Sequence, residues 1–567
     1  MEELTPHPHA SRWSGPRCWV VTTIVGLVLG AILSQLIPAT MSTPPSAQDQ
    51  AQVEQADPES SGPGDDPAVP MSLTWVQDGS GPPAAIELQG SEGEGGERAD
   101  PPEHEPGNGQ ATGTGEPGAK SAEHHEASPE IKLWMVIPFV LLLGSIALMP
   151  FISEHFWHDH FPDFAFLLGS MVVSYYLLAF DQPYHEATYG AYKMTHAWLE
   201  YYAFMALVGG LFVASGGVLV DVRGRGGPIV NTAILAFGAV IANVVGTTGA
   251  SVLLIRPFLR VNEGRLRPIH VVLFIFIVSN CGGALTPIGD PPLYLGFLKG
   301  VPFQWTILHL WPMWATAIGL LLAIFVVIDL RIGPARDEDG QVRQSKERTS
   351  VRIGGVSGMI ALGLIIFGVF LDTILASAGA RWAEHMPVGA TFQIAVAIVA
   401  YLVADKKIHE SNEFNFFPVK EVGLLFIGIF ATMAPALGFL ASHGASLGLD
   451  SPTKFYFGTG ALSGVLDNAP TYLNFLQVAF ASHGLDLTPD NVHHFLATDT
   501  GRHELAAVSI GAVFFGAMTY IGNGPNFMVR AIAEASGLRM PSFFGYVVRA
   551  LVLLVPVLLV TWFFFIR

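Results

Sequence analysis

The chain carries little charge for its length. Only 13% of its 567 residues are Asp, Glu, Lys or Arg, and 50% are hydrophobic. A soluble protein of this size carries about twice that charged fraction. Apolar runs close to the ~20 residues that cross a bilayer recur along the sequence. The scarcity of charge therefore excludes an ordinary soluble protein and predicts a multi-pass membrane protein.

Cysteine and nucleotide-binding motifs are scarce as well. The two cysteines, Cys18 and Cys281, each lie in an apolar run, so no disulfide framework is predicted and cysteine indicates no compartment. The sequence has no Gly-Lys-Thr loop of the kind that binds ATP phosphates. We expect a protein that is not an enzyme, with no cofactor, no nucleotide and no nucleic acid among its partners.

Most of the net charge lies in one segment. Between residues 37 and 131, eighteen acidic residues stand against Arg98 and Lys120, so this segment holds nearly all of the formal net charge of −18. It is rich in Gly, Pro, Ser and Gln, and it has too few apolar residues to offset the entropy lost on folding. We predict a disordered acidic extracytoplasmic tether over 37–131.

Residues 1–36 have the pattern of a segment that enters the membrane. Arg12 and Arg17 precede the apolar run CWVVTTIVGLVLGAIL at 18–33. This pattern is typical of a signal peptide or of an uncleaved signal anchor. The sequence shows no clear A-x-A cleavage site after the run, which favours the anchor.

The remaining apolar runs are of two kinds. Spans are predicted at about 132–153, 163–181, 201–221, 268–298, 306–330, 354–376, 388–405, 419–441, 503–533 and 543–566. Two further runs, 228–256 and 453–481, are interrupted by the polar stretches NVVGTTGAS and LDNAPTYLN. The interruptions predict that these two runs do not cross the membrane as single helices.

Positive charges assign the sides of the interrupted runs. Arginines stand on both sides of 228–256, which places both of its ends in the cytoplasm under the positive-inside rule. The 453–481 run is flanked by SHGASLGLD and SHGLDLTPDN, with Lys454 as the nearest cation, which places both of its ends outside. We therefore predict two re-entrant hairpins that enter the membrane from opposite sides.

The predicted path divides into two halves of opposite orientation. A cation-rich cytoplasmic linker at 331–353 separates a first repeat, 132–330, from a second, 354–567. Each half has three spans, one hairpin and two further spans. We predict an all-α polytopic protein of the inner (cytoplasmic) membrane with two inverted-topology repeats, an arrangement typical of secondary transporters.

Each half also breaks the span that follows its hairpin. The first break is Thr286–Pro292 (TPIGDPP) and the second is Ile521–Asn526 (IGNGPN), and they align as IGDPP over IGNGP. Glycine and proline stop a helix inside the membrane, which frees backbone groups and exposes the dipoles of half-helices. Each half therefore supplies one polar hairpin tip and one broken helix.

Asp290 adds a carboxylate to the first break. Placing it in the membrane costs at least ~2.5–3.5 kcal/mol on lenient insertion scales, so such a residue is a candidate for ion binding. The alternative is that Pro291 and Pro292 end the span near the surface, with Asp290 as a polar cap. The matching break in the other half favours the ion site.

The hairpin tips and breaks contain further candidate ligands. Asp467 is a second carboxylate, and its role as a cap for the following helical arm is compatible with ion binding. Hard cations such as sodium prefer carboxylate, amide and carbonyl oxygens. Neutral oxygens come from Asn243, Thr247, Thr248, Thr286, Asn468, Thr471, Asn523 and Asn526.

Two other groups of titratable residues have simpler explanations. Glu200 opens the predicted span at 201–221, and His196 one turn earlier could share a proton with it, but an interfacial position accounts for both. The stretch EHFWHDHF at 154–161 could bind zinc through its histidines and Asp159. Its spacing matches no standard zinc motif, and such residues are common at membrane interfaces.

The breaks and tips resemble motifs of a known superfamily. SNCGGALTPIGDPP at 279–292 and GVLDNAPT at 464–471 are similar to motifs of the citrate and dicarboxylate carriers, arsenite permeases and NhaD-type sodium/proton antiporters. The resemblance covers about 132–567 and implies a homodimer whose protomers have a scaffold and a moving transport part. It implies a site that also includes Asn280 and Gly289.

Two departures and one addition accompany this resemblance. NVVGTTGAS is not the Ser-Asn-Thr motif of dicarboxylate carriers, which weakens a citrate interpretation. Cys281 stands where an aliphatic residue is usual, and the acidic segment at 37–131 is not part of the family core.

The sequence thus predicts a secondary active transporter of one of two kinds. A sodium/proton antiporter would use a site that is negative when empty, with Asp290, Asp467 and Glu200 as proton-coupling candidates. The alternative is a sodium- or proton-coupled transporter of citrate, a dicarboxylate or arsenite, held by half-helix N-termini. The absence of a Lys or Arg from the breaks and tips argues against the anion. We expect sodium and protons, or a small anion, and the lipid bilayer as partners, with no metal beyond transported sodium.

Overall fold

The computed structural model describes residues 16–37, 129–184, 187–224, 226–333, 350–380 and 386–567. The predicted acidic tether lies outside the described residues except at its two ends, as does most of the predicted linker. Among the described residues, nine helices are long and apolar enough to span a membrane. The prediction of a helical multi-pass membrane protein is confirmed at this level.

The elements of the first half run as follows. They are α1 (Pro16–Leu36), η1 (Leu133–Val136), α3 (Ile137–Ile152), α4 (Glu154–Ala179), β1 (Pro183–Tyr184), β2 (Ala187–Thr188), α5 (Tyr189–Gly216), β3 (Leu219–Arg223), α6 (Pro228–Val261), α7 (Pro268–Ile277), η2 (Cys281–Gly283), α8 (Pro291–Leu298) and α9 (Phe303–Ile332).

The second half continues in the same manner. Its elements are β4 (Ser350–Gly354), α10 (Val356–Ser377), α11 (Val388–Val403), α12 (Lys406–Ser411), α13 (Phe417–His443), η4 (Gly444–Leu447), α14 (Pro452–Ser463), α15 (Asn468–Ser482), α16 (Pro489–Ala497), α17 (Asp499–Phe515), η5 (Gly516–Met518), α18 (Gly524–Ala535), α19 (Phe543–Leu553) and α20 (Val555–Phe565). The strands form two small antiparallel pairs, β1 with β2 and β3 with β4.

Side-chain caps set several helix boundaries. Thr188 Oγ1 accepts a hydrogen bond from the amide of Ala191 at 3.3 Å, which starts α5 at Tyr189. The helix therefore begins well before the predicted span at 201–221, and Glu200 lies inside it rather than at its start. The apolar periodicity marked only the more hydrophobic part of α5, because its first turns are polar and aromatic.

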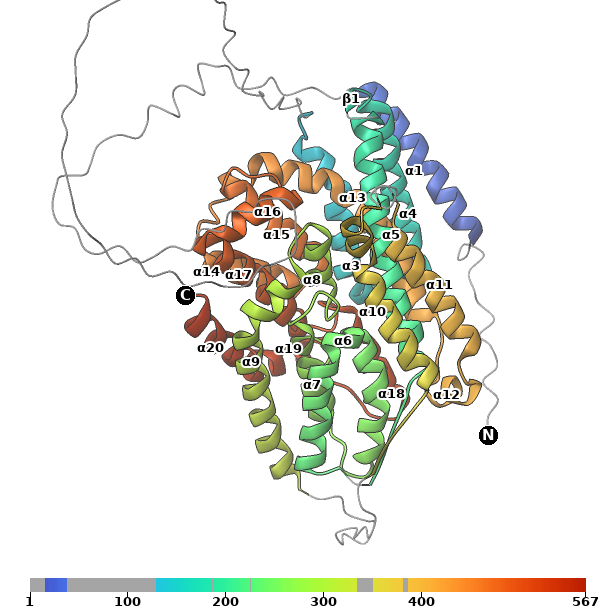
Figure 1. The fold of residues 1–567 in the computed structure, drawn as a ribbon, viewed down its shortest axis with the longest axis vertical. Coiled ribbons are helices and arrows are strands. Elements are labelled where there is room, and N and C mark those ends of the chain that lie inside the picture. The colour runs from blue at the N-terminus through green and yellow to red at the C-terminus, as the bar shows by residue number, and fades with distance from the viewer. Residues whose placement is uncertain (1–15, 38–128, 185–186, 225, 334–349, 381–385) are drawn as a thin grey trace, which may run out of the picture. The chain divides into compact units, whose positions relative to one another are not determined.

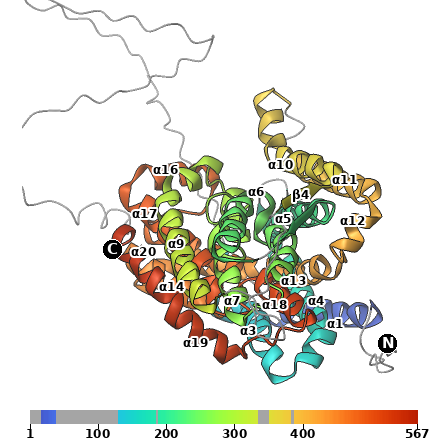
Figure 2. The same cartoon turned by 90° about the horizontal axis from the view of Figure 1, so that it is seen from below.

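The helices pack in two groups. The frame helices, α1, α3, α4, α5, α10, α11 and α13, contact mainly one another, and so do the remaining long helices, α6–α9 and α14–α20, here called the site group. Figures 1 and 2 show the two groups side by side. They meet where α5 packs on α6 and α8, and where α13 packs on α15. α5 and α13, the third long helices of the two halves, therefore each pack on the interrupted run that follows them in the sequence.

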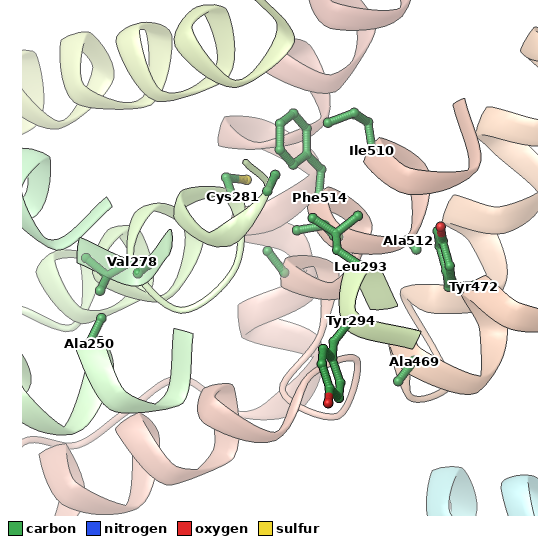
Figure 3. Close-up of a cluster of buried hydrophobic side chains, with 14 of the residues drawn as sticks. Ala250, Val278, Cys281, Leu293, Tyr294, Ala469, Tyr472, Ile510, Ala512 and Phe514 are labelled. Carbon is green, nitrogen blue, oxygen red and sulfur yellow. The ribbon is translucent and has the colours of Figure 1, made fainter. Parts of the chain in front are cut away.

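An apolar core holds the site group together. α7 is apolar on all sides, and its residues from His270 to Ile277 are buried. Four residues after α7 in the chain, Cys281 is a fully buried free thiol. Figure 3 shows Cys281 near side chains of α8 and α17, including Leu293 and Phe514. The two halves thus share one hydrophobic core around the broken helices.

Several cation-rich connections meet on one face of the protein. β3 and β4 pair residue by residue, and the Gly226 amide donates to the carbonyl of Val261 at 2.5 Å. Arg265 Nε donates to the carbonyl of Gly333 at 3.1 Å. The segments that the positive-inside rule assigns to the cytoplasm therefore lie together.

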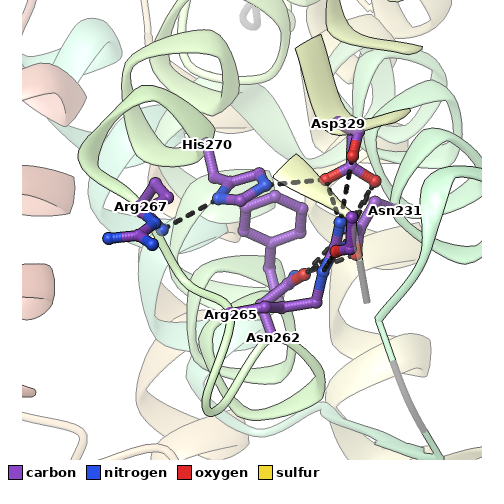
Figure 4. A network of polar contacts seen from close by, with 8 residues as sticks. Asn231, Asn262, Arg265, Arg267, His270 and Asp329 are labelled. Atoms are coloured by element: carbon purple, nitrogen blue, oxygen red, sulfur yellow. Dashed lines mark hydrogen bonds and ion pairs between the residues drawn. The ribbon is translucent and has the colours of Figure 1, made fainter. Parts of the chain in front are cut away.

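A buried ionic network closes the site group at this face. Asp329 Oδ1 accepts from Arg265 Nη2 and from His270 Nε2, each at 2.7 Å, and all three side chains are almost completely buried (Figure 4). Asn231 and Asn262 exchange two amide hydrogen bonds of 2.8 Å beside it. Losing one member would leave an uncompensated buried charge, so the network fixes α6, α7 and α9 relative to one another.

Candidate functional site

The first interrupted run, α6, folds back on itself at Gly246. This residue has φ +76° and ψ 157°, a conformation that glycine adopts without steric cost. A straight helix of 34 residues would be about 51 Å long, yet the amide just before α6, at Gly226, is hydrogen-bonded to its last residue, Val261. The second arm therefore begins at Thr247, and its free amides face the fold-back point.

Asn243 joins this tip to the first break. Its Oδ1 accepts from the Leu285 amide at 2.8 Å, and its Nδ2 donates to the carbonyl of Gly282 at 2.7 Å. Thr286 Oγ1 donates to the backbone carbonyl of Asn243 at 2.6 Å. Two predicted ligands, Asn243 and Thr286, thus bind the protein backbone and shape the site.

Gly289 completes the join because no larger residue fits. Its carbonyl accepts from the Thr247 amide at 2.8 Å. A Cβ on Gly289 would overlap the carbonyl oxygen of Gly283. The close approach of these two backbone segments therefore requires glycine.

The second break repeats the local structure of the first. The Gly289 amide donates to Thr286 Oγ1 at 3.1 Å, and the Gly522 amide donates to Thr519 Oγ1 at 3.2 Å. Asp290 and Asn523 then occupy equivalent extended N-cap positions, before α8 and α18. Thr519 was not among the predicted site residues, although TPIGDPP and TYIGNGP align there.

Asp290 lies at the centre of these elements. It is 1% exposed. Its Oδ1 accepts from Thr247 Oγ1 at 2.7 Å and from Asn523 Nδ2 at 3.0 Å, and its Oδ2 accepts from Asn468 Nδ2 at 2.6 Å. Each donor comes from a different tip or break, so one carboxylate joins both halves of the chain.

Four helix N-termini converge on this carboxylate. Asp290 occupies the N-cap position of α8, Thr247 begins the second arm of α6, Asn468 is the first residue of α15, and Asn523 occupies the N-cap position of α18. A helix N-terminus carries a partial positive charge of about half a unit, which stabilises a nearby anion. The field at this point therefore comes from backbone dipoles, since the tips and breaks contain no Lys or Arg.

A chain of amides supports the donors to Asp290. Asn523 Nδ2 also lies 3.2 Å from Asn280 Oδ1, and Asn280 Nδ2 donates to Asn526 Oδ1 at 2.6 Å. Asn526 Nδ2 in turn donates to the carbonyl of Gly516 at 2.8 Å. The predicted residues Asn280, Asn523 and Asn526 are therefore brought together, and only Asn523 touches Asp290.

Asp467 and Thr471 belong to the second tip but do not contact Asp290. Asp467 is partly exposed and caps α15 by accepting from the Ala469 amide at 3.0 Å. Thr471 Oγ1 donates to the carbonyl of Asp467 at 2.8 Å. The predicted capping role of Asp467 is thus present, and it places a second carboxylate one residue before Asn468, which donates to Asp290.

A small cavity adjoins Asp290. Its volume is about 30 Å³, and it lies between the first tip, the first break and α5. Thr247 and Thr248 contribute hydroxyl-bearing side chains to its wall, whereas α5 contributes apolar side chains such as Leu211 and Phe212. A space of this size holds a water molecule or a small cation.

Glu200 and the histidines at 155–160 lie apart from this cluster. Glu200 Oε1 pairs with Lys299 Nζ at 2.5 Å, and Lys299 directly follows α8. His160 Nδ1 lies 2.9 Å from Asp163 Oδ2. In the described part of the chain, no three His, Cys, Asp or Glu side chains are arranged to hold a metal ion. Lys299 was not singled out from the sequence, because nothing local links it to Glu200.

Known proteins resemble this chain over most of its length. Residues 128–566 match the protein family described as "Putative citrate transport". An uncharacterized transporter of Mycobacterium bovis is 25% identical over 345 residues, which cover 56% of this chain and 72% of that protein. An uncharacterized transporter of Mycobacterium tuberculosis matches with the same identity and coverage.

Proposed function

We propose that this chain, a multi-pass membrane protein that belongs to the citrate-transport family, exchanges sodium for protons at Asp290. The observation that carries the proposal is the environment of this carboxylate. Its three hydrogen-bond partners are neutral, and its net charge is left for a mobile cation to neutralise. Sodium and a proton then compete for one site, and this competition couples their movement.

Asn468 provides a partner for either form of Asp290. Its Nδ2 donates to Asp290, while its own Oδ1 is buried and has no hydrogen-bond partner among the described residues. Rotating the amide by half a turn would let Oδ1 accept a hydrogen bond from the protonated carboxyl group of Asp290 or coordinate a sodium ion beside it. Asp467, one residue earlier, supplies a second carboxylate, which favours either cation when it is ionised.

The proposal includes an architecture that supports alternating access. We propose that α6 and the α14–α15 pair are re-entrant hairpins from opposite sides, within two inverted repeats of an inner-membrane homodimer. Three features support the repeat. The breaks have the same local structure, α5 and α13 hold equivalent places, and each interrupted run has its ends close together, since Gly444 before α14 packs on Ala481 of α15.

A second function, coupled transport of an anion such as citrate, is favoured by two observations. One is the family to which residues 128–566 belong. The other is the convergence of four helix N-termini, which would attract a carboxylate if Asp290 were neutral. In this alternative a proton or sodium ion on Asp290 would accompany the anion.

Transport assays in everted membrane vesicles separate the two functions. Vesicles loaded with a pH-sensitive dye should alkalinise when sodium is added, and they should not accumulate labelled citrate. Citrate accumulation without a sodium-evoked pH change would support the anion transporter and overturn sodium/proton exchange. Vesicles from cells without the protein give the background for both measurements.

A further inference from the structure

A helix outside the family match packs closely on the frame helices. The match begins at residue 128, whereas α1 covers Pro16–Leu36. α1 lies along α4, and this is the most extensive pairing of two helices in the described part of the chain (Figure 1). The sequence of α1 alone is compatible with a signal peptide that is removed, so its packing distinguishes the two possibilities.

Small residues let the backbones of α1 and α4 approach. A Cβ on Gly26 would overlap Ser170 Oγ, and a Cβ on Gly30 would overlap the carbonyl oxygen of Met171. Ser34, a further four residues along α1, is 6% exposed. Small residues at this spacing form close helix interfaces in membranes. The interface therefore depends on particular residues of α1 and not only on its hydrophobicity.

Hydrogen bonds from α4 reach the backbone of α1. Ser174 Oγ donates to the carbonyl of Leu27 at 2.6 Å. Near the end of α1, the Tyr175 hydroxyl donates to the carbonyl of Ile37 at 2.8 Å. Trp19 stacks on Phe166 with ring centroids 5.9 Å apart. A segment removed during export would make no lasting use of these specific contacts.

Tyr175 also contacts Trp134, which follows the acidic segment in the sequence. Its ring meets that of Trp134 edge to face, with centroids 5.4 Å apart. Ile37 and Trp134 flank the acidic segment, so the same tyrosine holds both of its flanks. Ile37 and Trp134 therefore both lie against α4.

We propose that α1 is retained in the mature protein as an accessory membrane helix docked on α4, with Tyr175 of α4 in contact with both Ile37 and Trp134. The opposite face of α1 fits this role, because Val20, Ile24 and Val28 are each about half exposed and can face lipid. This inference is independent of the transported ion.

Two measurements on the full chain test the proposal. The intact mass of protein purified through a C-terminal tag should include residues 1–36. In a chain with a specific protease site inserted between residues 38 and 128, cleavage in mild detergent should leave the α1 fragment bound to the C-terminal fragment. A mature protein that begins after residue 36, or an α1 fragment that separates from the otherwise unaltered chain, would overturn the proposal.

A pair of glycine substitutions tests the interface itself. Gly30→Leu should weaken retention of the α1 fragment about tenfold or more, because the side chain would overlap α4. Gly144→Leu in α3 is the matched control, since no atom lies within 4 Å of a Cβ built there. Equal retention in both variants would contradict the docking geometry. If Gly30→Leu fails to fold, the intact mass and the protease cleavage of the chain without this substitution still test the proposal.

Discussion

At the residue scale, the site depends on how a buried carboxylate is partnered. Asp290 accepts hydrogen bonds from Thr247, Asn468 and Asn523, and among the described residues no Lys, Arg or His is hydrogen-bonded to it. Such bonds to a charged group contribute more than neutral ones because the donor's dipole meets a full charge. The site therefore holds a negative charge in place without cancelling it.

Removing the Asn468 amide should weaken the response to sodium. Hydrogen bonds to charged groups contribute about 1.5–3 kcal/mol, so Asn468→Val should raise the half-saturating sodium concentration about tenfold to a hundredfold. Asn474→Val is the matched control, because Asn474 lies on the same helix and its Nδ2 donates to the carbonyl of Pro470 instead of to Asp290. Sodium titrations of vesicle alkalinisation measure the effect, and equal responses of the two variants would argue against a role for Asn468.

Substitution of Gly289 should disrupt the join between the first tip and the first break. Gly289→Ala places a methyl group against the carbonyl of Gly283, so we expect a thermal unfolding temperature several degrees lower and little exchange. Gly524→Ala, in the second break, has open space around the new methyl group and should behave like the wild type. Thermal unfolding in detergent and vesicle assays check both, and a Gly289→Ala variant as stable as Gly524→Ala would contradict the close approach.

At the element scale, the interrupted helices are defined by what stops them. The chain turns at Gly246 in α6, and Pro291, within the first break, begins α8. A helix stopped inside the membrane needs other partners for its free backbone groups, and the tips and breaks supply them to each other. Thr247 and Gly289 make one such pair.

Labelling of introduced cysteines tests the sidedness of the two hairpins. In a chain without Cys18 and Cys281, Glu263→Cys should react only with cytoplasmic reagent and Asp486→Cys only with external reagent. Both positions are exposed, and Glu263 avoids the positive φ of Gly264 next to it. Labelling of the two positions from the same side would contradict the proposed inverted repeat.

The positions of the breaks could be predicted from the sequence, because glycine, proline and asparagine in an apolar run mark them directly. The burial of Asp290 followed from the same pattern. The bond between Asn280 and Asn526 joins residues 246 positions apart, and no local pattern indicates such a contact. The partner of Glu200 was missed for the same reason, since Lys299 is 99 positions away.

At the scale of the whole molecule, the frame helices and the site group have different roles. The site lies wholly in the site group, which meets the frame mainly where α5 and α13 pack on the interrupted runs. α5 presents apolar side chains to the cavity beside Asp290, and the polar side chains that line this cavity come from the site group. The buried network around Asp329 fixes α6, α7 and α9 as one body.

The acidic segment should be dispensable for transport. Deleting residues 45–122 while keeping α1 should leave sodium-dependent exchange within a few-fold of the wild type, because a segment of this composition contributes no packed surface. Activity is compared at equal amounts of protein in the membrane. Loss of exchange at normal membrane levels would assign the segment a direct role in transport.

The central claim is that Asp290 carries the exchanged cation, and its most direct test is sodium-dependent proton flux in vesicles that contain Asp290→Asn. The amide keeps the size of the side chain but has no charge to attract sodium and no proton to release, so exchange should fall to background while the protein still folds and inserts. Asp290→Glu should retain part of the activity with weaker sodium affinity, because the charge remains and its position changes. Full activity of Asp290→Asn, normalised to folded protein, would contradict the account.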